Sequence, residues 1–206
     1  RFALGTGQGV FLYNYQEDRF QSFPAGGPSD VRALLRVGDK LWIGAISGLY
    51  CYDIATRQLV DYGKSNPKNK IKTAVYALDQ VGDRLLIGTY NGLFELNPAQ
   101  KEALPLELPD YRPGSNQFVN SIFTIKESAK TFIGTEYGLY LYKNSTRTLQ
   151  KTPVLQNHPI KAMTSKDKNT LLVGTDDGLF SYQLDKQLVS RIKHDSRNRN
   201  SLANNI

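Results

Sequence analysis

The sequence predicts an all-β fold, a β-propeller of four-stranded antiparallel blades, from three observations. A ten-residue core that reads apolar-Gly-Thr-x-x-Gly-Leu-aromatic-x-Tyr occurs five times, over residues 4–13, 43–52, 87–96, 133–142 and 173–182. The first glycines of these cores are 39 to 46 residues apart, which is the length of one propeller blade. Each unit consists of short β-rich runs between Gly, Asn and Asp turns, with no apolar stripe at helical spacing.

Composition bounds the class of protein. The 206 residues are 40% hydrophobic and 11% aromatic, which suits one repeat array, so we assign residues 1–206 to a single propeller segment. The net charge is +7, but the lysines and arginines are spread through turns and strand ends. Such spread charge is typical of a solvated surface, and we expect no nucleic-acid partner. Cys51 is the only cysteine, which excludes an internal disulfide and a Cys-rich zinc site.

The strands of each unit follow in a fixed order. An inner strand comes first, at residues 31–34, 72–75, 119–122 and 160–163, with a small third residue that suits crowding near an axis: Ala33, Ala74, Ser121 and Ala162. A second strand then leads into the Gly-Thr-x-x-Gly stretch, whose last glycine supplies the positive φ of a tight hairpin. A third strand with period-two alternation and a charged outer strand complete the blade.

The two ends of the sequence leave the ring closure open. The first residues read as a second strand, and residues 201–206 align with residues 117–122 as an inner strand. In a closed ring that strand pairs with residues 1–4 and completes a composite fifth blade. In an open arc it begins a sixth blade, and the five repeats are part of a larger, seven-bladed propeller. We favour the arc and expect this chain to be a segment of a longer protein.

No constellation of catalytic residues is present in the sequence. The two histidines, His158 and His194, lie in predicted loops, and no spacing links them to a nucleophile or a metal site. The Gly-Thr-x-x-Gly stretches are followed by no helix and lack the lysine of a phosphate-binding loop, so a hairpin explains them. We therefore predict no catalytic residue, no metal and no cofactor.

Binding is the better hypothesis, because a propeller brings its second-to-third-strand hairpins and its inter-blade loops to one face. Tyrosine rings stack on sugars, carboxylates and amides hydrogen-bond hydroxyls, and basic groups pair with acidic sugars. Asn and Asp before Gly are also ordinary turn formers. A purely structural role therefore stays open as the alternative to ligand binding at each of these hairpin positions. The candidate ligand-binding residues are Tyr90, Asn91, Glu136, Tyr137, Asp176 and Asp177 in the hairpins, with Arg32 and Lys161 on the inner strands.

The string Leu41-Trp42-Ile43-Gly44-x-x-x-Gly48-Leu49-Tyr50 resembles the two-component regulator propeller repeat, and residues 194–206 look like the blade start of that family. Only this blade keeps the tryptophan of the repeat, and it has Ala45 in place of threonine. The resemblance implies a periplasmic sensor region of an inner-membrane hybrid histidine kinase. In that family two seven-bladed propellers precede an immunoglobulin-like domain, a membrane span and the kinase.

The resemblance implies a noncatalytic sensor segment that responds to oligosaccharides and relays the signal to a distant kinase. Its expected partners are an oligosaccharide ligand, the neighbouring propeller and immunoglobulin-like domain of the same chain, and a second copy in a homodimer. Two other classes stay open. A protein-protein assembly scaffold uses the same face without a small ligand, and a polysaccharide lyase or hydrolase needs a cluster of acids and bases there.

Overall fold

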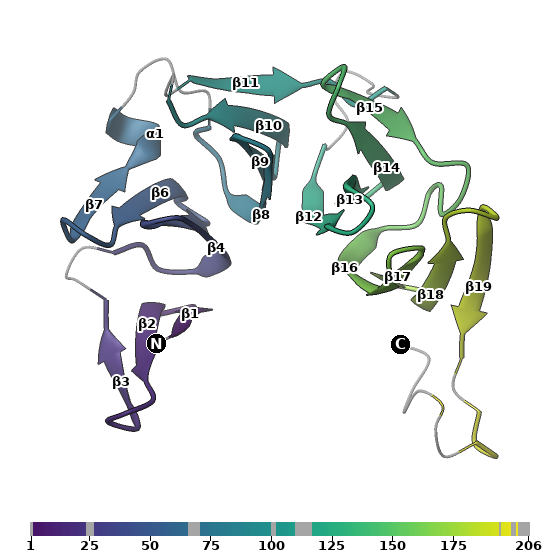
Figure 1. The fold of residues 1–206 in the computed structure, drawn as a ribbon, viewed down its shortest axis with the longest axis horizontal. Helices are drawn as coiled ribbons and strands as arrows, with labels where there is room; N and C mark the ends of the chain where they lie inside the picture. Colours follow the sequence, from purple (N-terminus) through teal and green to yellow (C-terminus); the bar gives the residue numbers. More distant parts are fainter. Residues whose placement is uncertain are drawn as a thin grey trace. The chain divides into compact units, whose positions relative to one another are not determined.

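The structure is a computed structural model that describes residues 2–23, 27–65, 71–99, 102–109, 117–193, 195–198 and 201. The chain divides into two compact units, unit 1 (Arg1–Pro105) and unit 2 (Leu106–Ile206). Each unit consists of antiparallel sheets whose strands are hydrogen-bonded in chain order (Figure 1). No helix among the described residues is long and apolar enough to cross a membrane.

Unit 1 contains one sheet of three strands and two sheets of four. A single helical turn, α1 (Tyr62–Ser65), follows the second sheet. The strands are β1 (Phe2–Thr6), β2 (Gly9–Asn14), β3 (Arg19–Ser22), β4 (Val31–Val37), β5 (Lys40–Ala45), β6 (Gly48–Asp53), β7 (Gln58–Asp61), β8 (Val75–Val81), β9 (Arg84–Thr89), β10 (Gly92–Asn97) and β11 (Glu102–Leu106).

Unit 2 contains two sheets of four strands. Its strands are β12 (Val119–Ile125), β13 (Lys130–Thr135), β14 (Gly138–Lys143), β15 (Thr148–Lys151), β16 (Ile160–Asp167), β17 (Thr170–Thr175), β18 (Gly178–Gln183) and β19 (Leu188–Ile192).

The predicted all-β fold of four-stranded antiparallel blades is confirmed. Four of the five repeats form complete four-stranded sheets, and the first forms the three-stranded sheet β1-β2-β3, which begins on a second strand as the repeat indicates. The seven-bladed ring stays a prediction. The alternative closures depend on residues 1 and 202–206, which lie outside the described residues, as does His194.

In three of the repeats the first glycine packs closely against the next blade. At Gly5, Gly44 and Gly134, a Cβ atom would lie only 2.5 to 2.6 Å from a γ-methyl carbon of the residue that begins the first strand of the next blade. These residues are Val31, Val75 and Ile160. A side chain on any of these three glycines would displace the buried methyl group, so these positions require glycine for close packing and not for an unusual φ.

The predicted position of one first strand is wrong. The sequence places this strand at residues 72–75, with Ala74 as the small residue, whereas β8 begins at Val75. Its small residue is Ala77, which pairs with Gly88 after a bulge, as Ala33 pairs with Gly44 in the preceding blade. The Ala74 carbonyl instead accepts a hydrogen bond from the Tyr90 amide at the end of the hairpin.

The threonine of the repeat closes the hairpin between second and third strands. In the β9–β10 hairpin, Thr89 Oγ1 donates to the Gly92 carbonyl at 2.8 Å and accepts from the Asn91 amide at 3.1 Å. The same pair of hydrogen bonds recurs at Thr6, Thr135 and Thr175. The positive φ predicted for the hairpin falls on its closing glycine, with φ of 122° at Gly92. These four hairpins are therefore held by their own backbone and by the threonine hydroxyl.

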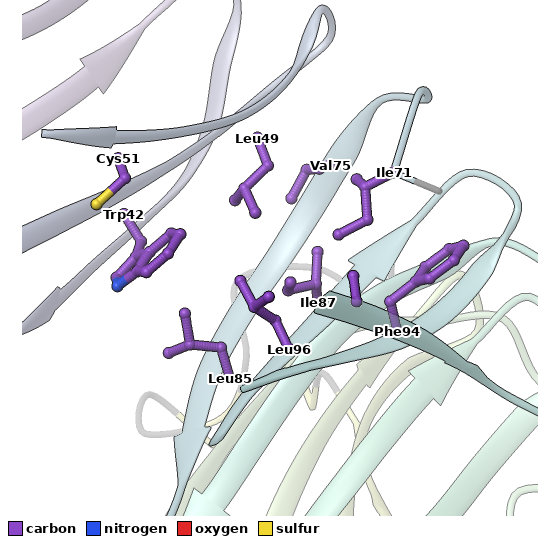
Figure 2. Packing of buried hydrophobic residues seen from close by; sticks show 10 residues of the cluster. Trp42, Leu49, Cys51, Ile71, Val75, Leu85, Ile87, Phe94 and Leu96 are labelled. Carbon is purple, nitrogen blue, oxygen red and sulfur yellow. The ribbon is translucent and has the colours of Figure 1, made fainter. Parts of the chain in front are cut away.

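The hydrophobic core of unit 1 lies between successive blades. Trp42 is 1% exposed and belongs to one cluster with Leu85 and Leu96 of the following blade. Figure 2 shows the indole directed toward these two leucines, with Cys51 beside it. In unit 2 the corresponding cluster contains Phe132 and Tyr182.

Candidate functional site

The hairpins of unit 2 carry polar side chains next to the starts of first strands. The β13–β14 hairpin places Glu136 and Tyr137 at its tip, and the β17–β18 hairpin places Asp176 and Asp177 at the equivalent positions. Because β13 ends opposite the start of β12, and β17 opposite the start of β16, residues at the starts of these strands lie beside the hairpins.

Four side chains of this region form what we call the hairpin cluster: Asn120, Glu136, Lys161 and Asp176. Glu136 Oε1 accepts hydrogen bonds from Asn120 Nδ2 at 2.7 Å and from Lys161 Nζ at 3.1 Å. Lys161 Nζ also lies 3.4 Å from Asp176 Oδ2. Asn120 and Glu136 belong to one blade and Lys161 and Asp176 to the next, so the cluster joins the two blades of unit 2.

The hairpin cluster keeps both of its central groups charged. Partial burial opposes ionisation of Glu136, but hydrogen bonds from Asn120 and Lys161 and the lysine charge outweigh it and lower the pKa of the carboxyl. Burial likewise opposes the charge on Lys161, but Glu136 and Asp176 outweigh it and raise the pKa of the ammonium. The Glu136 side chain is 26% exposed and the Asp176 side chain 61% exposed, so carboxylate oxygens remain accessible to a ligand.

A histidine–aspartate contact lies next to the cluster. His158 Nδ1 is 2.9 Å from Asp177 Oδ2, and the His158 ring lies 5.5 Å from the Phe180 ring between centroids. The loop that carries His158 is also held by the Asn157 amide, which donates to the Tyr137 carbonyl at 3.1 Å. The loop before β16 is therefore fixed to the hairpins of both blades.

The other predicted site residues lie in unit 1. Tyr90 is 47% exposed at the tip of the β9–β10 hairpin, and Asn91 closes that hairpin through its amide. Arg32 is exposed on β4. The exposed Tyr90 ring offers a face for stacking, whereas Asn91 fulfils the turn-forming role that is its alternative interpretation.

The structure thus brings together three of the predicted residues, Glu136, Lys161 and Asp176, and places Asp177 beside them. Tyr137 is 44% exposed on the same hairpin as Glu136. Sequence reasoning missed Asn120 and His158. A signal for Asn120 existed, because it occupies the same blade position as Lys161, the second residue of a first strand.

The arrangement is suited to hydrogen bonding rather than to proton transfer. Glu136 and Asp176 both contact the Lys161 ammonium, and Asp177 adds a third carboxylate beside His158, so the surface offers many acceptors and little free positive charge. A general acid needs a raised carboxyl pKa, whereas that of Glu136 is lowered. Among the described residues, no group of three His, Cys, Asp or Glu side chains is placed to hold a metal ion.

Comparison with known proteins gives matches among solved structures. No family model and no curated protein matches the chain. Two structures of the extracellular domain of BT4673 from B. thetaiotaomicron match with a TM-score of 0.85 and 36% identity over 99% of this chain. One is described as a "putative one component system" and the other as a "putative hybrid two component system". The extracellular domain of BT3049 from the same organism matches with a TM-score of 0.79 and 23% identity over 98% of this chain, which shows the fold.

These matches confirm the family resemblance predicted from the repeats. Nearly the whole chain is a relative of extracellular domains of hybrid two-component systems, at 36% identity to BT4673. The chain spans 28% of the length of each of these relatives. Because the relatives are extracellular domains, they support an extracellular or periplasmic location for this segment.

Proposed function

We propose that this chain is a noncatalytic ligand-sensing segment in the periplasmic region of an inner-membrane hybrid two-component sensor, and that its ligand is an oligosaccharide. The 36% identity to the BT4673 extracellular domain is the observation that carries the sensor role. The hairpin cluster supports the ligand class, because exposed carboxylates and a neighbouring tyrosine are the groups that hydrogen-bond and stack on sugar rings.

The charges of the hairpin cluster indicate which class of sugar the site favours. Lys161 is already paired with Glu136 and Asp176, so its charge is not available to an acidic sugar. The excess of carboxylates repels anions and attracts cations. In unit 2 the site therefore favours a neutral sugar, or one with an amino group, over a uronic or sulfated sugar.

Signal relay follows from the position of the cluster across two blades. Asn120 and Glu136 lie on one blade, and Lys161 and Asp176 lie on the next. A ligand that bonds to both blades binds one packing of the blades better than another. Such unequal binding is the physical requirement for shifting a conformational equilibrium toward kinase activation or inhibition.

Calorimetry tests this proposal. The intact periplasmic region is titrated with neutral, amino-containing and acidic oligosaccharides, and we expect binding heat with at least one of the first two classes. Asp176→Asn together with Glu136→Gln should abolish that heat. Asp185→Asn is the matched control, because Asp185 lies in the β18–β19 turn and bonds the local Lys186 amide. Absence of heat with all three classes, or heat that persists in the double variant, contradicts the proposal.

One observation favours a second role for the first sheet, in packing against another part of the same protein. The first sheet exposes Phe2, Tyr15 and Phe20 at 37%, 64% and 55%, around Tyr13. In the next blade Tyr52, which stands at the repeat position of Tyr13, is buried and packs on Phe23 of the preceding sheet.

We propose that a further blade of the same protein covers this aromatic face. Phe20→Lys should then lower the melting temperature of the intact protein more than that of the isolated 206 residues. Equal effects in both would contradict this packing role.

A further inference from the structure

A cleft in unit 2 lies between the two blades and is separate from the hairpin cluster. It has a volume of about 200 Å³ and is lined by parts of β13, β14, β15 and the end of β18 with the turn that follows. Its lining includes Lys130, Phe132, Leu141, Gln150, Tyr182 and Gln187. None of the hairpin-cluster residues lines the cleft.

The corresponding place in unit 1 is filled by an aromatic side chain. Phe132 pairs with Leu141 in unit 2, as Trp42 pairs with Cys51 in unit 1. The Trp42 indole is packed against the next blade (Figure 2). It also packs against the Tyr62 ring, 5.2 Å away between centroids. Phenylalanine is smaller than tryptophan, and the cleft opens beside it. The space between the two blades of unit 2 can therefore hold an aromatic ring from a ligand. In unit 1 the Trp42 side chain fills the corresponding space.

The walls of the cleft suit an aromatic guest. Phe132 and Leu141 provide an apolar surface, and Tyr182 lies across from them on the next blade. A cavity of about 150 Å³ lined by apolar side chains is known to admit benzene, so 200 Å³ is adequate for a bicyclic ring. Aromatic side chains prefer offset or edge-on contact with such rings.

The polar groups of the cleft suit an anion. Lys130 and Lys151 line it, and none of its lining residues carries a carboxylate. Lys130 makes no ion pair with any described residue. The Tyr182 side chain is buried, and within the described part of the chain its hydroxyl has no hydrogen-bond partner. The amides of Gln150 and Gln187, which also line the cleft, add further donors.

We propose that this inter-blade cleft binds small aromatic carboxylates, with the ring between Phe132 and Tyr182 and the carboxylate near Lys130. The ring occupies the place that Trp42 holds in unit 1, and the carboxylate takes hydrogen bonds from the lysine and the neighbouring donors. Bound ligand would lock these two blades together, independently of any sugar at the hairpin cluster.

The test uses indoleacetate as the probe, with neutral indoleacetamide and cationic tryptamine as matched comparisons, on the intact protein by ligand-observed NMR titration. For a ligand of this size we expect a dissociation constant on the order of 1 mM. The anion should bind about threefold more tightly than the other two, because one partly exposed lysine supplies the charge.

Two variants make the result specific to the cleft. Phe132→Trp fills the space and should abolish binding of all three probes, with retention of the fold checked by thermal unfolding. Lys130→Gln should remove the preference for the anion, whereas Lys143→Gln, an exposed lysine on β14 outside the cleft, should not. Equal binding of the three probes, no binding of indoleacetate at about 10 mM, or an unchanged anion preference in Lys130→Gln would overturn the proposal.

Discussion

Replacement of Gly134 by alanine tests the glycine joint between blades. A Cβ at this position would lie 2.5 Å from Ile160 Cγ2 and 2.7 Å from Ser121 Oγ, both closer than real Cβ contacts. Ile160 is 0% exposed, begins β16 and belongs to the buried core cluster of unit 2, so it cannot move out into solvent. The substitution therefore forces the two blades of unit 2 apart or displaces the isoleucine from its rotamer.

Two opposing effects set the change in the free energy of unfolding for Gly134→Ala. Overpacking of a well-packed core costs about 1–3 kcal/mol. Alanine is favoured over glycine within a strand by roughly 0.5–1 kcal/mol, which offsets part of that cost. We expect Gly134→Ala to lower the free energy of unfolding by about 1–2 kcal/mol. A Cβ added at Gly174 would have no described neighbour closer than 3.7 Å, so Gly174→Ala should be neutral or slightly stabilising in the same chain.

A double-mutant cycle in chemical denaturation isolates the contact. Ile160→Ala alone removes a buried side chain and should cost about 2–5 kcal/mol. Since it also removes the Cγ2 methyl that meets the new Cβ, the double variant should be less destabilised than the sum of the two single variants by about 1 kcal/mol or more. Additive effects, or equal losses in Gly134→Ala and Gly174→Ala, would refute the steric reasoning.

Three further outcomes are expected. Thr89→Val keeps the shape of the buried side chain but removes the hydroxyl that closes the β9–β10 hairpin, and it should cost about 1–2 kcal/mol in chemical denaturation; an unchanged midpoint would show that the hydroxyl is dispensable. The pKa of Glu136 is lowered on folding, so its stabilisation is complete above the ordinary glutamate pKa of about 4.3 and is lost as the pH falls through the lowered value. NMR titration of the Glu136 carboxyl checks this, and a normal or raised pKa would contradict the described hydrogen bonds. Arg84 pairs with Glu95, whose side chain is buried. Arg84→Met should therefore lower the free energy of unfolding by about 3 kcal/mol, and the added change Glu95→Leu should restore most of that stability. Thermal unfolding checks this, and no recovery in the double variant would argue against the pair.

The fold could be predicted from the sequence because the same pattern of glycines and threonine marks the strands and the hairpin in the repeats. The first glycine, the threonine and the second glycine mark a strand, a hairpin and the next strand, and the structure gives each a separate physical reason. The start of β8 could not be placed, because two alanines, Ala74 and Ala77, both fit a small position. Only the pairing of Ala77 with Gly88 across the sheet decides between them.

The hairpin cluster could be predicted in part, since blade topology brings Glu136, Lys161 and Asp176 to one region. The ion pairing of Lys161 was not foreseeable, because it depends on side-chain distances between neighbouring blades. His158 lies in a loop of irregular length, for which the repeat gives no alignment. The change from Trp42 to Phe132 is visible in the sequence, but only the packing shows that it leaves a cleft.

Hydrogen exchange of the intact protein, with and without neutral oligosaccharides, tests the central proposal that the hairpins of neighbouring blades form the sensing surface. We expect slower exchange in the β13–β14 and β17–β18 hairpins and in the loop before β16, with the outer strands β15 and β19 unchanged. Protection confined to the outer strands, or to parts of the protein outside these blades, would contradict it.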